Sequence, residues 1–270
     1  MSSSINSPGQ PESALDSTQL AAQEQFSRQS QRYGRGHILE NVADVDEAIG
    51  FLSLTQRARV LDVACGAGHT GLRLAELGHS VTCADLSPAM LERTREGAAA
   101  RNARIETKQH AAESMPYPDG TFDLVTCRVA PHHFSSPGQF VGEVARVLRA
   151  GGWFLLIDGT VPDNDADAGE WLNRVEKLRD PSHVRLLAPG EWCRLCVDAD
   201  LHIWRHWLRQ KKQPDLGWYF ETAATPAENR AEVLALVYSA SPRVREIYHL
   251  AEEGGKIVWQ WPMLSLLAQK

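Results

Sequence analysis

The feature that most constrains the fold is a strand–turn–helix pattern in residues 60–71, VLDVACGAGHTG. The apolar run before the turn is short and β-branched, which is typical of a buried strand, and residues 72–77 continue as a helix. Gly66 and Gly68 allow a tight turn and let a ligand lie against the backbone. The following helix offers free N–H groups at its N-terminus. The pattern therefore predicts a nucleotide-type binding turn.

Two cofactors are compatible with this turn. Gly66, Gly68 and Gly71 match the dinucleotide fingerprint, with Asp85 near the spacing of a ribose-binding acid. S-adenosylmethionine (SAM) is favoured by Asp62, four residues before the first glycine. A carboxylate there would repel a pyrophosphate but attract the ammonium group of the methionine moiety. The alternative for Asp62 is an acid that merely caps the turn.

Strands and helices alternate through the first 160 residues, which predicts βαβ units and a parallel sheet. The expected strands are 59–64, 80–84, 105–108, 122–128 and 153–158, and the expected helices are 69–78, 87–101 and 138–149. Farther along, we expect helices at 167–178, 188–198 and 225–250 and strands at 201–209 and 257–268. In such sheets the ligand lies beyond the carboxyl ends of the strands.

Three parts of the chain are expected. Residues 1–20 are rich in Ser, Gln and Pro and predict a disordered tail. Residues 21–54 predict a helical lid, in which Gly34 and Gly36 would give the mobility of a flap. Residues 55–270 form the main domain, with helical additions at about 165–200 and 213–252.

Composition narrows the classes of function. The 270 residues carry a net charge of −6, which argues against binding to nucleic acid. No apolar run approaches the ~20 residues that span a bilayer, and the N-terminus lacks a signal-peptide pattern. We therefore expect a cytoplasmic protein with no membrane span. Cys193 and Cys196 form a lone C-x-x-C, for which helix packing is favoured over a metal site.

Four linked motifs carry a family resemblance: VLDVACGAG, VTCADLSPAML, AAESMPYPDGTFDLVTCR and VLRAGGWFLLID. In this order and spacing they resemble the class I SAM-dependent methyltransferases, most of all the branch around the ubiquinone and menaquinone C-methyltransferases and their uncharacterised small-molecule relatives. The resemblance covers residues 22–160, and residues 173–185 look like a segment of those uncharacterised relatives. It implies a Rossmann-like α/β fold whose seven-stranded, mostly parallel sheet has an antiparallel last strand.

The resemblance also implies cofactor-binding positions. Asp85 matches the acid that accepts both ribose hydroxyls, as a two-oxygen carboxylate can. The remaining matches lie around the methionine moiety, against adenine, at the end of the fourth strand and in the lid: Asp62, Ala64, Gly66 and Gly68; Leu86, Met90, Ala112 and Glu113; Arg128; and Tyr33. Many relatives carry an acid where this chain has Ala111, so adenine is held either by Glu113 or by backbone and apolar contacts alone.

The implied reaction transfers a methyl group from SAM to a small organic acceptor and leaves S-adenosylhomocysteine (SAH). The enzyme must align the acceptor and exclude water. If a base is needed, His132 and His133 follow the fourth strand, and we select His133; Asp158 is a second candidate. The acceptor is expected between this loop and the aromatic-rich region after residue 160.

Two other functions stay open from the sequence. One is a NAD-dependent oxidoreductase, which Asp62 disfavours, and the other is a non-catalytic SAM-binding protein, which the alanine at position 111 would suit. The methyl acceptor and the atom methylated are unresolved between O-, C- and N-methylation. We expect a small-molecule substrate, no nucleic-acid partner, no metal and, as an option, a homodimer.

Overall fold

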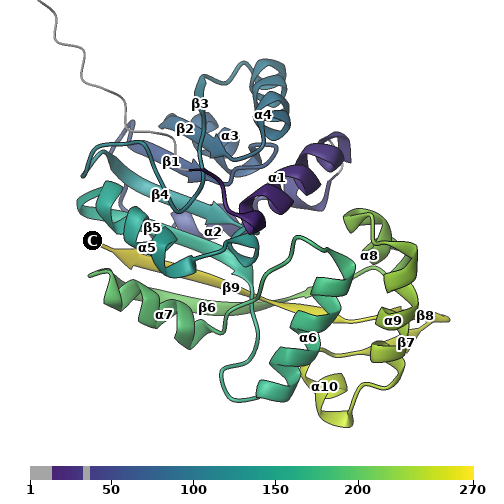
Figure 1. Ribbon diagram of the computed structural model, residues 1–270. Helices are drawn as coiled ribbons and strands as arrows, with labels where there is room; N and C mark the ends of the chain where they lie inside the picture. Colours follow the sequence, from purple (N-terminus) through teal and green to yellow (C-terminus); the bar gives the residue numbers. More distant parts are fainter. Residues whose placement is uncertain (1–13, 33–36) are drawn as a thin grey trace, which may run out of the picture.

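A seven-stranded sheet runs through the centre of the protein (Figure 1). The computed structural model describes residues 14–32 and 37–270. The strand order is β3-β2-β1-β4-β5-β9-β6, and β9 runs antiparallel to both of its neighbours. The strands are β1 (Arg59–Val63), β2 (Ser80–Asp85), β3 (Ile105–Gln109), β4 (Phe122–Arg128), β5 (Leu148–Gly159), β6 (His202–Lys212) and β9 (Gln260–Gln269). This confirms the predicted fold class.

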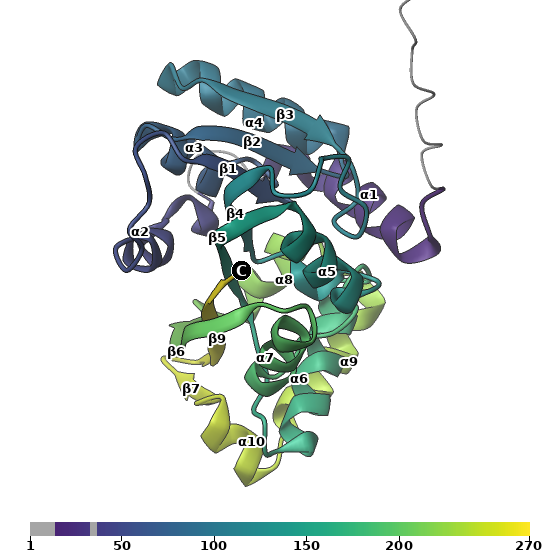
Figure 2. The ribbon, with the colours of Figure 1, turned by 90° about the vertical axis from the view of Figure 1, so that its left-hand side faces the viewer.

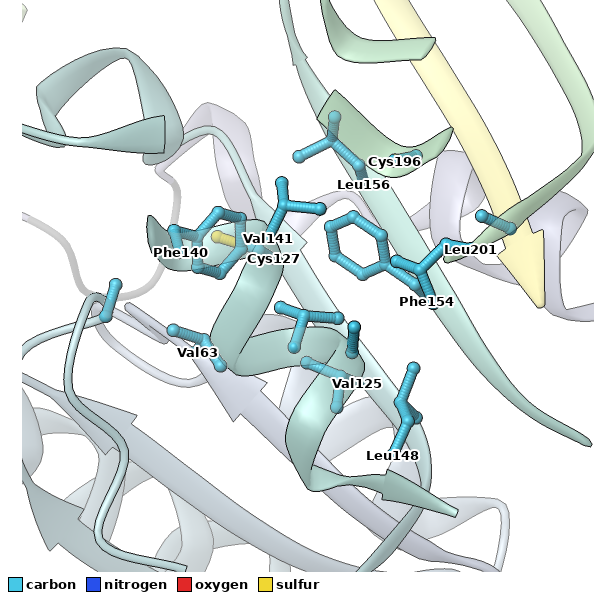
Figure 3. Close-up of a cluster of buried hydrophobic side chains, with 14 of the residues drawn as sticks. Val63, Val125, Cys127, Phe140, Val141, Leu148, Phe154, Leu156, Cys196 and Leu201 are labelled. Carbon is cyan, nitrogen blue, oxygen red and sulfur yellow. The ribbon is translucent and has the colours of Figure 1, made fainter. Parts of the chain in front are cut away.

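Helices cover both faces of the sheet because its strands are apolar on both sides. Along β4, Leu124 packs with helix α2 (Ala43–Ile49) and helix α3 (His69–Glu76), whereas Val125 packs with helix α5 (Pro137–Val147). Figure 3 shows this second core, in which Phe140 of α5 lies among strand residues such as Val125. Helix α7 (Pro189–Asp198) completes that layer. Such two-sided burial is what a parallel sheet requires.

Helix α4 (Pro88–Arg101) lies along the β2–β3 end of the sheet. The Ser87 hydroxyl accepts the Met90 N–H at 3.3 Å, and Pro88 occupies the first helical position. Both features confirm the predicted helix start. The helix thus begins directly after β2, beside the carboxyl end of that strand.

A third hydrophobic core lies beyond the sheet (Figures 1 and 2). Its helices are α6 (Ala166–Arg179), α8 (Leu216–Ala223), α9 (Ala227–Tyr238) and α10 (Pro242–Ile247). Aromatic pairs hold it together: Trp171 stacks on Tyr248 at 5.5 Å, and Tyr219 meets Trp259 edge-on at 4.5 Å. We call these four helices the appended layer.

Three expected elements differ in detail. Residues 21–54 are not one helix: the described parts are α1 (Ser17–Gln29), the 3₁₀ turns η1 (Ser30–Arg32) and η2 (Ile38–Glu40), and α2. The expected helix over 225–250 is split into α9 and α10. A new helix begins at Pro242, because the Ser241 side chain caps it by accepting the Val244 N–H. The expected strand over 257–268 is divided between β9 and the hairpin of β7 (Ala251–Glu253) and β8 (Lys256–Val258).

The hairpin has a simple local cause. Gly254 and Gly255 adopt φ of 57° and 75°, as the two central residues of a tight hairpin turn require. The expected tail boundary at residue 20 falls inside α1, which begins at Ser17. Within residues 14–32 and 37–270, no helix is long and apolar enough to cross a membrane, and no His, Cys, Asp or Glu cluster is suited to a metal ion.

Candidate active site

One large cavity opens at the carboxyl ends of the central strands, between α1 and the appended layer. Its first half is lined by the glycine turn, the ends of β2 and β4 and helix α1, and includes Ala64, Gly66, Asp85, Leu86, Met90, Ala112, Glu113 and Arg128. Its second half is lined by the loop after β4, helix α6 and strands β6 and β9, and includes His132, His133, Glu176, Arg179, His183, Lys211 and Trp261. The two halves form one continuous space.

The glycines of the turn have different tasks. Gly66 lines the cavity with φ 55°, and a Cβ built there would meet no described atom within 4 Å. A Cβ at Gly68 (φ 80°) would lie 2.6 Å from the Thr94 methyl group, and one at Gly71 would collide with Cys83. Gly66 therefore leaves room for a ligand, whereas the other two let α3 pack closely on its neighbours.

Asp62 does not reach the cavity, contrary to the predicted contact with the cofactor. It is 1% exposed, and its oxygens accept the Thr126 hydroxyl at 2.7 Å and the Gly71 N–H at 2.9 Å. Burial raises the pKa of Asp62 to about 6. The carboxylate thus ties β4 and the first turn of α3 to β1, which is the capping role weighed against the ligand role.

Asp85 is placed as predicted, at the end of β2 and in the cavity wall. Its oxygens accept the N–H groups of Gly66 at 2.9 Å and Ser87 at 2.8 Å. Burial raises the pKa of Asp85 to about 6. Each oxygen keeps further acceptor capacity for a pair of hydroxyl groups.

The Glu113 carboxylate bonds other parts of the chain, although Glu113 also lines the cavity. Its Oε2 accepts the Gln19 side-chain amide at 3.0 Å, and its Oε1 accepts the Ser135 backbone N–H at 3.0 Å. The proposed replacement of the missing acid at Ala111 by Glu113 is therefore not what the geometry shows. Leu86, Met90 and Ala112 leave an apolar slot beside it.

Arg128 has partners within the chain that the sequence did not indicate. Its guanidinium donates to Asp44 Oδ2 at 2.9 Å, to the Leu39 carbonyl at 2.9 Å and to the Asn41 carbonyl at 2.7 Å. The side chain is 6% exposed. It anchors residues 39–44 and also lines the cavity, so its contact with the methionine group stays a prediction. Tyr33, the predicted lid aromatic, lies outside the described residues.

His132 faces the second half of the cavity and is oriented by Asp158. Its Nδ1 lies 2.7 Å from Asp158 Oδ1, and its backbone N–H donates to Oδ2 at 3.0 Å. Burial lowers the pKa of His132, but the charge and hydrogen bond of Asp158 outweigh it, so the pKa lies above its usual value. With Nδ1 engaged, Nε2 is the nitrogen left for a substrate proton.

His133, the residue selected from the sequence, is a poorer base. It is 8% exposed, its Nδ1 lies 3.1 Å from the Ser182 hydroxyl, and Phe26 of α1 meets its ring edge-on at 4.8 Å. Burial, then the neighbouring His132, lowers the pKa of His133 to about 3. The geometry therefore favours His132 over His133.

Residues 173–185 form the opposite wall of this half. The His132 carbonyl accepts the Val184 N–H at 2.8 Å, and Asn173 Oδ1 lies 3.1 Å from His183 Nε2. The His132 and His183 rings lie 5.5 Å apart. The sequence matched this segment to the uncharacterised relatives but gave no signal that it would pack against the two histidines.

A largely buried polar network forms part of this wall and was missed from the sequence. Glu176 is 6% exposed and accepts the Tyr219 hydroxyl and the Trp261 indole N–H, both at 2.8 Å. Arg179 donates to Glu176 Oε2 at 3.1 Å and lies over the Tyr219 ring at 4.5 Å. Because these residues come from α6, α8 and β9, only the folded chain brings them together.

Comparisons with known proteins agree with this geometry. The methyltransferase domain family matches residues 61–156. The uncharacterised methyltransferase YcgJ of Bacillus subtilis is 31% identical over 83% of this chain and 88% of its own length. The chain belongs to the class I SAM-dependent methyltransferases. A crystal structure of YcgJ covers 85% of this methyltransferase and 99% of that chain with a TM-score of 0.79 and 29% identity.

A demethylmenaquinone methyltransferase of Deinococcus radiodurans is 37% identical over 38% of this methyltransferase and 44% of its own length. The predicted family and enzyme class are thus confirmed, and the dinucleotide alternative is set aside. SAM is the cofactor of this family. The open space at Gly66, the carboxylate of Asp85 and the apolar slot at Leu86 fit its aminoacyl, ribose and adenine groups.

Proposed function

We propose that this methyltransferase methylates an acidic O–H or C–H group of a small molecule, with His132 as the base and Asp158 as its orienting partner. The 2.7 Å contact between these two side chains, in a cavity continuous with the SAM cleft, carries the proposal. A hydroxyl or enol is a weak nucleophile until it loses its proton, so a positioned imidazole is most useful for such acceptors.

When bound, SAM would supply an electrophilic methyl group. The chain's own residues position the reactants. Asp85 holds the ribose hydroxyls, and Leu86, Met90 and Ala112 enclose adenine. His132 Nε2 takes the acceptor proton, and Asp158 stabilises the resulting imidazolium. Helix α1 closes the cleft against water through Gln19, Gln23 and Phe26.

Turnover of the variant His132→Asn, measured on a panel of phenols, quinols and amines, tests the base. We expect kcat to fall by on the order of 10²-fold or more for hydroxyl acceptors. The matched control is His202→Asn, because His202 is exposed at the start of β6 and does not line the cavity. SAH affinity should be unchanged in both variants. Unchanged turnover in His132→Asn would show that alignment alone drives transfer.

Three predictions about partners and location belong with this proposal. The net charge of −6 supports a small-molecule acceptor instead of a nucleic acid. A homodimer and a cytoplasmic location stay predictions of the sequence. Light scattering of the purified protein and fractionation of its host cell would test them.

A further inference from the structure

The cations of the cavity wall are not equivalent. Among the described lining residues, Arg128 is paired with Asp44 at 2.9 Å and Arg179 with Glu176 at 3.1 Å. The backbone carbonyl of Lys211 accepts the Gln213 side-chain amide at 3.3 Å, but its ammonium makes no hydrogen bond or ion pair with any residue of 14–32 or 37–270. It is the wall's cation without a carboxylate partner in that part of the chain.

Other basic residues of β6 do have carboxylate partners. Arg209 forms an ion pair with Glu47, and Lys212 Nζ lies 2.6 Å from Glu253. Successive side chains of a strand point to opposite faces, so Lys211 and Lys212 are directed differently. Lys211 therefore lines the cavity, although β6 is the edge strand of the sheet.

No neighbouring carboxylate is free to balance the charge of the Lys211 ammonium in the described part of the chain. It is partly buried, and burial followed by the charge of Arg128 lowers its pKa, with Asp44 opposing. Asp44 is already engaged by Arg128. A partly desolvated ammonium without a partner is unfavourable, and an anion placed beside it would recover that free energy.

The position of Lys211 indicates which ligand would supply the anion. Cofactor sites in this sheet type lie over the central strands, whereas β6 is the edge strand beyond β5 and β9. In the β6–β9 pairing, Lys211 stands opposite Trp261, which also lines the second half of the cavity. Lys211 thus lies between Trp261 of the second half and Arg128 of the first half.

We propose that Lys211 binds an anionic group of the methyl acceptor, so that the substrate is a small acid that carries both the nucleophile and a carboxylate or phosphate. This inference rests on the proposed function and names the substrate class of the same site. His132 would take the proton of the nucleophile, and Lys211 would fix the other end of the molecule. The same ammonium chemistry would suit the carboxylate of SAM, so the test must separate these two sources.

Calorimetry on the SAH-loaded protein, with 4-hydroxybenzoate and its neutral analogue 4-hydroxybenzamide as probes, tests the proposal. We expect the wild-type protein to bind the acid roughly tenfold more tightly than the amide. Lys211→Met should abolish this preference, and the matched control Lys212→Met should keep it. Equal binding of acid and amide by the wild type, binding of neither, or a preference that survives in Lys211→Met would overturn the proposal.

A second titration separates the cofactor from the acceptor. SAH and 5′-methylthioadenosine, which lacks the amino acid, are titrated into Lys211→Met. Unchanged affinity for both is expected. Weaker binding of SAH alone would assign Lys211 to the cofactor carboxylate and overturn the acceptor assignment. No methyl transfer occurs in these experiments, so an error about His132 as base would not affect their outcome.

Discussion

The guanidinium of Arg128 holds the carboxylate of Asp44 at 2.9 Å across 84 residues of sequence. Together with its bonds to the Leu39 and Asn41 carbonyls, this contact fastens the segment before α2 onto the end of β4. A residue that the family pattern places at the cofactor thus holds a chain segment whose residue Leu39 lines the cavity. This relationship gives the first prediction.

Replacement of Arg128 by methionine should loosen residues 39–49. The change removes three hydrogen bonds from a charged, nearly buried side chain, and we expect a loss of roughly 2 kcal/mol of unfolding free energy. Hydrogen exchange should speed up in this segment, and SAH affinity should fall. The matched control is Arg209→Met, which removes an exposed ion pair to Glu47 of the same helix and should change exchange little.

Asp85→Ala should weaken SAH binding by roughly 1–3 kcal/mol, because two ribose hydroxyls would lose their acceptor. Asp62→Asn should instead lower the unfolding free energy with a smaller effect on affinity, because Asp62 bonds Thr126 and Gly71. Calorimetry and thermal melting of the two variants make the comparison. Equal loss of affinity in both would return Asp62 to the ligand.

The pH dependence of turnover should report the pair of His132 and Asp158. Since His132 acts as a base, kcat should rise with pH through its pKa, which lies above the usual histidine value. Asp158→Asn removes the charge that raises this pKa, so the midpoint should move to lower pH while the maximum of kcat falls. A midpoint that stays in place would show that another group is being titrated.

His133 should destabilise the fold in acid. Burial lowers its pKa to about 3, so between the usual histidine pKa and that value the unfolded chain binds a proton that the native protein does not. The unfolding free energy must therefore fall as pH falls through this window, by roughly 1–2 kcal/mol at pH 5 for one such group.

Denaturant unfolding of His133→Gln beside the wild type at pH 7 and pH 5 measures this contribution. The variant should lose less stability on acidification than the wild type. His202→Gln, at an exposed position, is the control for a general histidine effect. If both variants respond to acid as the wild type does, His133 is protonated in the native state.

The sequence predicted correctly those features that depend on a single short segment of the chain. The glycine turn, the strand alternation and Asp85 at the end of β2 are local patterns, and the structure places all of them as expected. The antiparallel strand followed from the family resemblance. Two adjacent glycines, Gly254 and Gly255, are an equally local signal, and they could have predicted the hairpin of β7 and β8.

The sequence was insufficient where a polar side chain had several partners to choose from. Asp62, Glu113 and Arg128 were each assigned to the cofactor, yet each bonds a distant part of the chain. The preference for His132 over His133 depends on Asp158, 26 residues away, and on the desolvation of each ring. Such outcomes are decided by tertiary burial, which one sequence does not display.

Helix α1 is hydrogen-bonded to both halves of the cavity wall. Gln23 donates to the Leu86 carbonyl at 2.9 Å beside the adenine slot, and Gln29 donates to the Ala223 carbonyl of the appended layer at 3.0 Å. A helix bonded on both sides must part from both when it opens. Departure of SAH then requires the acceptor half to open as well, so one movement of α1 should release both products.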